Sequence, residues 1–290
     1  MHNNDWSLIF FTLLSQLGVG IVLVLGIIYF ANTQHFHALQ SGGPIRTPQF
    51  IALVAIAIAT FISFFHLGHP AHAFHAANNL GSSWLSREIL GIGLFGAGVF
   101  LVFLISVFKW QNAALVTTIL IFTVITGLFL VYAMSGIYMI GTIPAWNIWF
   151  TPFHFFMSAI ILGSMVLSGF FISRQISAET VTWILRFVTL FLLFQMVAAF
   201  LYKNHLVKME HAGIDHPDFT AGMYHTLYLI RLFAIFIAAV FTAYLSIRVG
   251  SVAENFSPTL RFYGFVFFLI VVEEIIGRYL FYEGFYRIGV

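Results

Sequence analysis

The sequence predicts an all-α protein, an integral membrane bundle of eight transmembrane helices. Of its 290 residues, 61% are hydrophobic and only 8% are charged, against about 25% charged residues in an ordinary soluble domain. The apolar residues form continuous runs of about 20, the length with which a helix crosses a bilayer while its backbone groups bond internally. A membrane β-barrel would instead show alternating segments of about ten residues.

The eight predicted spans occupy nearly the whole chain, so we expect a single transmembrane domain over residues 1–290. The predicted bounds are roughly 8–30, 49–67, 88–108, 114–140, 152–172, 182–202, 223–247 and 262–282. The first span contains small residues that let a neighbouring helix approach closely; they are Ser15, Gly18, Gly20 and Gly26. The stretch from Lys203 to Thr220 is predicted to be a polar loop.

Charge placement predicts the orientation. The loops opposite the N-terminus carry Arg46, Lys109, Arg174, Arg186, Arg248 and Arg261, whereas those on the N-terminal side carry Arg87, Lys203 and Lys208, with Arg287 in the tail. The positive-inside rule then places the N-terminus outside, and an even number of spans returns the C-terminus to the same side. No Lys or Arg precedes the first span, which is unlike the basic start of a cleaved signal peptide.

The absence of cysteine excludes thiolate-bound clusters and disulfides within the chain. Any iron–sulfur cluster that exchanges electrons with it must belong to a partner. A b-type haem needs facing histidines inside the spans, and no predicted span carries a histidine near its middle. A b-type cytochrome anchor is therefore a less favoured alternative than the proton-coupled transporter or channel considered below.

Residues 61–89, between the second and third spans, concentrate polar groups. They include Pro70, which we expect to end the second helix near His69. The histidines of this stretch are His66, His69, His72 and His75. Each step of three residues rotates the next histidine about 60° backward around a helix, so at most two of the four share a face. We therefore expect no metal site, and both solvated interfacial histidines and a ligand site stay open.

Glu88 is predicted to lie in the first turn of the third helix, where the helix dipole favours a carboxylate. An acid at this position is ordinary in any helix. Glu88 and His66 nevertheless flank one loop on one side of the membrane, so both can face the same pocket. A neutral histidine accepts a hydrogen bond from a hydroxyl group, and a carboxylate relays a proton.

The last two spans contain the residues that are most costly in a membrane. Arg231 and Glu274 are both predicted roughly 12 Å deep from the N-terminal side, and opposite charges at matching depth favour pairing. Arg278 follows Glu274 at the favourable i+4 position. We expect Arg231, Glu274 and Arg278 to form one buried cluster, with Glu273 turned elsewhere. A structural salt-bridge set, a quinol or proton path, and a proton-coupled transporter or channel site are the open readings.

Three motifs resemble the DmsC family, the membrane-anchor subunits of dimethyl sulfoxide reductase and related molybdoenzymes. The first is HLGHPAHAFHAANNLGSSWLSREI, beginning at His66. The second comprises Pro144, Trp146, Thr151, Pro152, Phe155 and Phe156, and the third comprises Glu274, Ile276, Gly277, Arg278, Phe281 and Tyr282. They occur in the family's order along the whole chain. Two positions depart from the expected pattern, because His72 and Asn79 stand where basic residues are expected.

The resemblance implies a multi-pass subunit of the bacterial inner membrane that oxidises menaquinol. Its partners would be an iron–sulfur subunit and a molybdopterin catalytic subunit on the outer, periplasmic face, in anaerobic respiration. His66 and Glu88 match the family's quinol-site histidine and glutamate. We expect no haem or metal in this chain and no nucleic-acid partner. The further candidates for quinol binding are Ser86, Trp84, Trp146, Arg231, Glu274 and Arg278.

Overall fold

The computed structural model describes residues 5–31, 46–64, 79–110, 112–211, 220–251 and 256–284. Within these ranges the chain forms helices and no strands, so the all-α prediction is confirmed. The helices are α1 (Asp5–Ala31), α3 (Arg46–Ser63), α4 (Trp84–Phe108), α5 (Ala113–Tyr138), α6 (Phe150–Ser173), α7 (Ala178–His211), α8 (Gly222–Ser251) and α9 (Phe256–Glu283).

Seven helices in the described ranges, α1 and α3 to α8, are long and apolar enough to cross a membrane. The chain is therefore consistent with a multi-pass membrane bundle. Helix α9 is also long enough, but it contains Arg261, Glu273, Glu274 and Arg278 and is not among the seven. The eighth span and the location of both termini stay predictions.

Two local predictions are wrong. Helix α7 continues to His211, so the first part of the expected loop from Lys203 is helical, because the first helix breakers after Lys203 are Gly213 and Pro217. Helix α4 begins at Trp84, where the Ser83 hydroxyl caps it by accepting a bond from the Ser86 backbone N–H at 3.3 Å. Glu88 therefore lies in the second turn of α4 rather than in the first.

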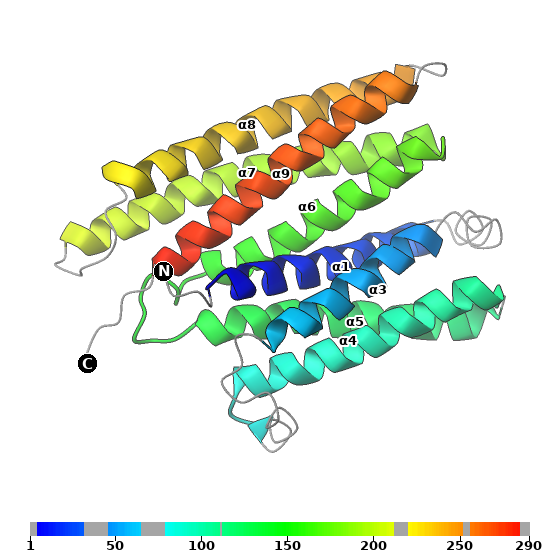
Figure 1. Cartoon of the computed structure of the whole chain (residues 1–290), viewed down its shortest axis with the longest axis horizontal. Helices are drawn as coiled ribbons and strands as arrows, with labels where there is room; N and C mark the ends of the chain where they lie inside the picture. Colours follow the sequence, from blue (N-terminus) through cyan, green and yellow to red (C-terminus); the bar gives the residue numbers. More distant parts are fainter. Residues whose placement is uncertain are drawn as a thin grey trace. The chain divides into compact units, whose positions relative to one another are not determined.

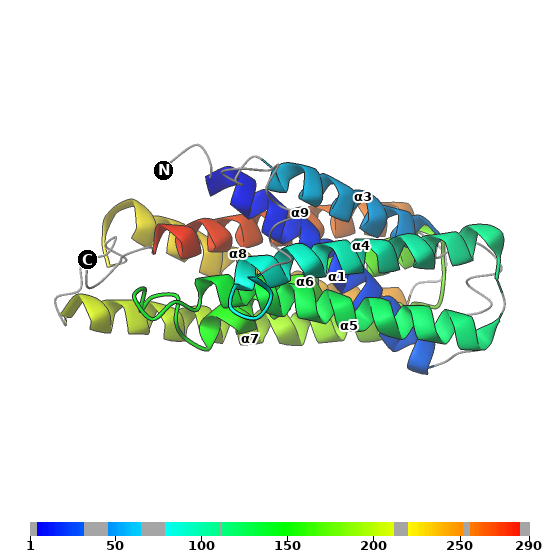
Figure 2. The ribbon, with the colours of Figure 1, turned by 90° about the horizontal axis from the view of Figure 1, so that it is seen from below.

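The chain divides into two compact units. Unit 1 contains Tyr138–Met157 and Ser168–Val290, and unit 2 contains His2–Ile137 and Ser158–Leu167. In unit 1, α7 packs against α8 and α8 against α9 (Figure 1). In unit 2, α3 packs against both α1 and α4 (Figure 2). The single domain expected over residues 1–290 stays a prediction.

Small residues let the helices of unit 2 approach closely. A Cβ atom added to Gly20 of α1 would collide with the backbone of Ala159, and one added to Gly163 would collide with the backbone of Gly20. A Cβ on Gly98 of α4 would lie 2.6 Å from the Thr123 hydroxyl oxygen of α5. The close approach expected at Gly20 is therefore confirmed.

In unit 1, aromatic side chains pack together between the segment before α6 and the end of α9. The Trp146 indole N–H donates to the Phe281 carbonyl at 2.7 Å, and the two rings stack with centroids 5.5 Å apart. Tyr138 contacts both rings edge-on, and its hydroxyl lies 3.1 Å from that of Tyr282. These contacts connect the segment before α6 to the end of α9.

Candidate functional site

The four histidines between the second and third predicted spans, His66, His69, His72 and His75, lie outside the described residues. The structure describes the other flank of that segment, residues 79–90. The juxtaposition of His66 with Glu88 therefore stays a prediction, as does the site that the two would form.

Glu88 lies on the buried face of α4 and is only 6% exposed. Within the described ranges its carboxyl group makes no hydrogen bond or ion pair with another residue. Burial of a carboxyl group costs free energy unless a partner compensates it. An environment of this kind is suited to a group that binds a ligand hydroxyl or exchanges a proton.

Trp84 begins α4 one turn before Glu88, and its ring is fixed from three sides. It packs against Gly136, where an added Cβ would lie 2.6 Å from the indole. The Tyr132 ring meets it edge-on at 5.3 Å, and the Arg87 guanidinium lies 4.3 Å above it. Arg87 also donates to the Leu80 carbonyl at 2.9 Å. These contacts hold the start of α4, and with it Glu88, in one orientation.

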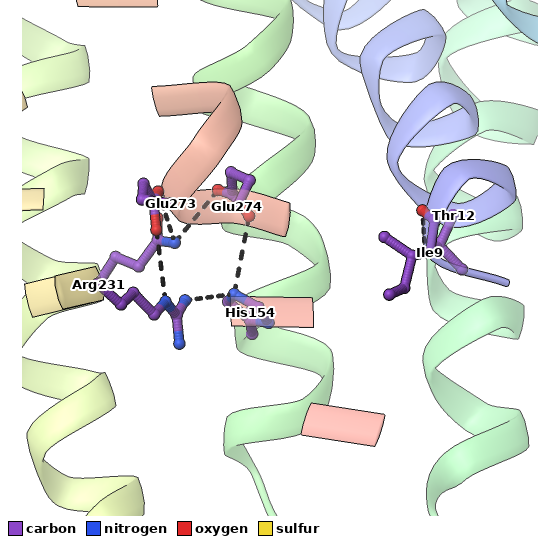
Figure 3. A network of polar contacts seen from close by, with 7 residues as sticks. Ile9, Thr12, His154, Arg231, Glu273 and Glu274 are labelled. Carbon is purple, nitrogen blue, oxygen red and sulfur yellow. Dashed lines mark hydrogen bonds and ion pairs between the residues drawn. The ribbon is translucent and has the colours of Figure 1, made fainter. Parts of the chain in front are cut away.

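A second group of polar residues lies in unit 1, and we call it the buried charge network. It consists of His154 of α6, Gln195 of α7, Arg231 of α8, and Glu273 and Glu274 of α9. Arg231 is 3% exposed and the other four side chains are 0% exposed. Figure 3 shows Arg231 and His154 directed toward the two glutamates.

Arg231 holds the network together. Its Nε donates to Glu273 Oε2 at 3.4 Å, and its Nη2 donates to His154 Nε2 at 2.7 Å (Figure 3). Because arginine has no acceptor, His154 Nε2 must accept this bond. The same nitrogen lies 3.7 Å from Glu274 Oε2. His154 therefore lies between the arginine and the second glutamate.

Gln195 bridges the two glutamates from α7. Its amide nitrogen donates to Glu273 Oε1 at 3.2 Å and to Glu274 Oε1 at 3.1 Å. Two carboxyl groups in succession on α9 are therefore bound to one amide group. An arrangement of this kind holds two acidic groups close together in a site of low dielectric constant, where a single proton changes the charge balance strongly.

Gly277 and Arg278 complete this part of α9. A Cβ on Gly277 would collide with the Arg231 guanidinium, so glycine is needed for that close approach. Arg278 is fully buried, with its guanidinium 3.8 Å above the Phe155 ring. Glu274 and Tyr282 lie about one helical turn before and after it on α9. The arginine is thus held by an aromatic face and by nearby acidic and phenolic groups.

The structure brings Arg231 and Glu274 into one buried network, as expected, with Arg278 beside it. The expectation that Glu273 turns elsewhere is wrong, since Glu273 forms the ion pair with Arg231. The cause is that Gln195 of α7 and Arg231 of α8 both reach this turn of α9, so neighbouring positions on the helix each meet a polar partner. His154 and Gln195 were not predicted as members. Gln195, a polar residue inside an apolar run, was the available signal.

Trp146 belongs to unit 1, whereas Trp84, Ser86 and Glu88 belong to unit 2. Trp146 is 8% exposed, and its indole N–H is used by the Phe281 carbonyl. Ser86 is buried. A single quinol site formed by all of these residues stays a prediction. Among the described residues, no three histidine or acidic side chains are arranged as metal ligands.

Long apolar helices, a buried carboxyl group at the start of α4 and a buried charge network define a multi-pass membrane protein with internal ionisable sites. The chain belongs to the DmsC family, since residues 1–284 match the family model described as the DMSO reductase anchor subunit. It is therefore an anchor subunit of the kind found in dimethyl sulfoxide reductase-type oxidoreductase complexes.

Curated relatives agree with this family. The chain is 25% identical over 281 residues to YnfH, an anaerobic dimethyl sulfoxide reductase chain of Escherichia coli (strain K12), covering 96% of this chain and 94% of that protein. It is 27% identical over 280 residues to a chain of the anaerobic dimethyl sulfoxide reductase of Haemophilus influenzae, with the same coverage. A shorter match, 32% identical over 113 residues, is to a sulfite dehydrogenase subunit of Allochromatium vinosum, covering 37% of this chain and 33% of that one.

Proposed function

We propose that this chain oxidises menaquinol in the bacterial inner membrane and passes the electrons to a partner iron–sulfur subunit. A molybdopterin catalytic subunit would then reduce the terminal acceptor on the periplasmic face. Family membership supports the role of anchor, and the names of the full-length relatives support the class of complex. The single observation that supports the site is Glu88, a buried carboxyl group without a partner among the described residues.

Quinol oxidation releases two electrons and two protons, so the site needs a hydrogen-bond acceptor for each hydroxyl and a route for protons to water. His66 and Glu88 supply an acceptor each in this proposal. Trp84 provides an aromatic wall one turn before Glu88 on α4, and Ser86 lies between them in the sequence. The further quinol-binding residues proposed are Trp146, Arg231, Glu274 and Arg278.

Titration of the purified membrane complex with a fluorescent quinol-analogue inhibitor tests the site. In the wild type we expect saturable quenching with about one site per complex. Glu88→Gln and His66→Ala are each expected to weaken binding and to lower quinol-driven electron transfer, while the complex still assembles. Glutamine keeps the size of Glu88 but cannot take up a proton, so this substitution separates chemistry from packing.

Glu179→Gln is the matched control, because Glu179 lies in the first turn of α7 in unit 1. It should bind the inhibitor and turn over like the wild type. Normal binding and turnover in both Glu88→Gln and His66→Ala, with correct assembly, would contradict the site. The buried charge network would then be the next quinol-binding candidate.

A further inference from the structure

Two buried tyrosines in unit 1 have hydroxyl groups that the packing of the described residues does not satisfy. Tyr202 of α7 is 7% exposed and Tyr228 of α8 is 6% exposed. Neither hydroxyl has a hydrogen-bond partner among the described residues. A buried hydroxyl without a partner is costly, and such groups are commonly satisfied by internal water. These two positions therefore indicate a hydrated region inside an otherwise apolar unit.

Both tyrosines lie next to the buried charge network. Tyr228 lies three residues before Arg231 on α8, about one helical turn away. The Tyr202 ring stacks on Phe150 with centroids 4.3 Å apart, and Phe150 stacks in turn on His154 at 5.3 Å. Gln195 also has a buried carbonyl oxygen without a partner in the described part. Unsatisfied polar atoms thus begin inside the network and continue beyond it.

Helix α9 gives the direction of this series. Arg231 packs on Gly277, whereas a Cβ on Gly284 would lie 3.3 Å from the Tyr202 hydroxyl. Gly284 lies just past the end of α9, seven positions after Gly277, which is roughly 10 Å along the axis. The Tyr202 hydroxyl is therefore displaced from the network toward the end of α9, a distance that a few hydrogen-bonded waters can span.

Charged and polar groups are found at that same end of the unit. The Tyr224 hydroxyl donates to Glu283 Oε2 at 2.9 Å. Lys203 Nζ lies 3.1 Å from His225 Nδ1 and 4.7 Å from the centre of the Tyr228 ring. The end of α7, the start of α8 and the end of α9 lie together here (Figure 1). The series thus leads from the glutamate pair to groups that are partly exposed.

We propose that unit 1 contains a proton-holding site at Glu273 and Glu274, connected to this end of the unit by a hydrated path past Tyr202 and Tyr228. One carboxylate of the pair takes up a proton and becomes a neutral carboxyl group. When it releases the proton it becomes a carboxylate again, and the proton passes through water to Glu283 or to bulk solvent. The path contains water and carries protons. Its existence does not depend on menaquinol oxidation by this chain.

The charges around the pair fit reversible proton binding. Arg231 and Arg278 offset the two glutamates when both are ionised, so the group then has no formal net charge if His154 is neutral. A proton bound to one carboxylate oxygen neutralises that carboxylate and leaves the group with a single positive charge. A purely structural ion-pair group would explain Arg231 and Glu273 but not the two unsatisfied tyrosine hydroxyls.

Infrared spectroscopy of the purified, oxidised complex in lipid, with quinol and inhibitor removed, tests the path. We expect a carboxyl C=O band that changes with pH, shifts in heavy water and is lost in Glu273→Gln or Glu274→Gln. After a pH jump, the band should respond at least about tenfold more slowly in Tyr202→Phe/Tyr228→Phe, which is about 1.4 kcal/mol in the barrier. Both substitutions remove only hydroxyls that have no described partner, so thermal stability should be unchanged or higher.

Tyr263→Phe is the matched control. Tyr263 is also buried in unit 1, but its hydroxyl lies 2.8 Å from that of Ser168. Loss of this hydroxyl should lower the thermal stability and leave the rate at which the carboxyl band responds to the pH jump unchanged. The path is disproved if no carboxyl band responds to pH, if the double tyrosine variant responds like the wild type, or if Tyr263→Phe slows the band equally. No quinol is present in this measurement, so failure of the proposed quinol site would not produce any of these outcomes.

Discussion

At the scale of single residues, Arg231 sets the energetics of unit 1. A buried guanidinium is tolerated only with partners that offset its desolvation, and Arg231 has Glu273 and His154 as direct ones. Removing one partner of such a pair leaves the other charge uncompensated, which is more costly than removing both. The contribution of Arg231 to stability therefore depends on Glu273 and His154 being present.

Arg231→Met is expected to lower the free energy of unfolding by about 3–5 kcal/mol, because it strands Glu273 in a buried site. Thermal unfolding in detergent and the yield of assembled complex measure this. Arg231→Met/Glu273→Met should recover most of the loss, since the uncompensated charge is gone. Glu274→Ala should likewise reduce the yield. A double variant no more stable than the single one would contradict the pairing.

At the scale of elements, a very close helix contact in unit 2 is that between α1 and α6. Glycine at positions 20 and 163 lets the two backbones touch. Where lipid replaces water, helix association depends on such close packing rather than on the hydrophobic effect. The contact needs glycine on both helices, so it is sensitive to a single methyl group.

Gly163→Ala is expected to destabilise the protein by about 1–3 kcal/mol, the usual cost of overpacking. Its Cβ would collide with the backbone of Gly20, which has no flexible side chain to move away. Gly93→Ala is the control, because a Cβ there meets nothing within 4 Å. Unfolding temperatures of the two variants give the comparison. Equal stability of Gly163→Ala and the wild type would show that the helices separate without cost.

At the scale of the whole molecule, the open property is the orientation in the membrane. The distribution of Lys and Arg predicts both termini outside. The chain has no cysteine, so single cysteines can be placed without a background from the chain itself. Ser82 lies in the turn before α4 and Asn112 lies just before α5, and both are exposed. They mark the two ends of α4.

Ser82→Cys is expected to react with a membrane-impermeant maleimide applied to intact spheroplasts. Asn112→Cys should react only after the membrane is opened, because it is predicted to face the cytoplasm. Gel analysis of the purified protein separates its label from that on partner subunits. The reverse pattern would overturn the orientation, and labelling of both from outside would show that α4 does not cross the membrane.

The sequence alone determined the helical membrane class, the approximate bounds of the helices and the family. These properties depend on local composition, on breakers such as Gly213 and Pro217, and on motifs read directly along the chain. It also identified Arg231 and Glu274 as partners, because isolated charges in a lipid-compatible helix require compensation.

Only the tertiary structure decided which side chains meet. The ion pair of Arg231 with Glu273 joins residues 42 positions apart, and the bond from Gln195 to Glu274 joins residues 79 apart. Membrane helices are apolar on every side, so they lack the amphipathic period from which a buried face is read in a soluble helix. No local sequence pattern specifies which face of such a helix is buried. Helix packing therefore decided that His154, Gln195 and Glu273 join the network and that Glu88 has no partner among the described residues.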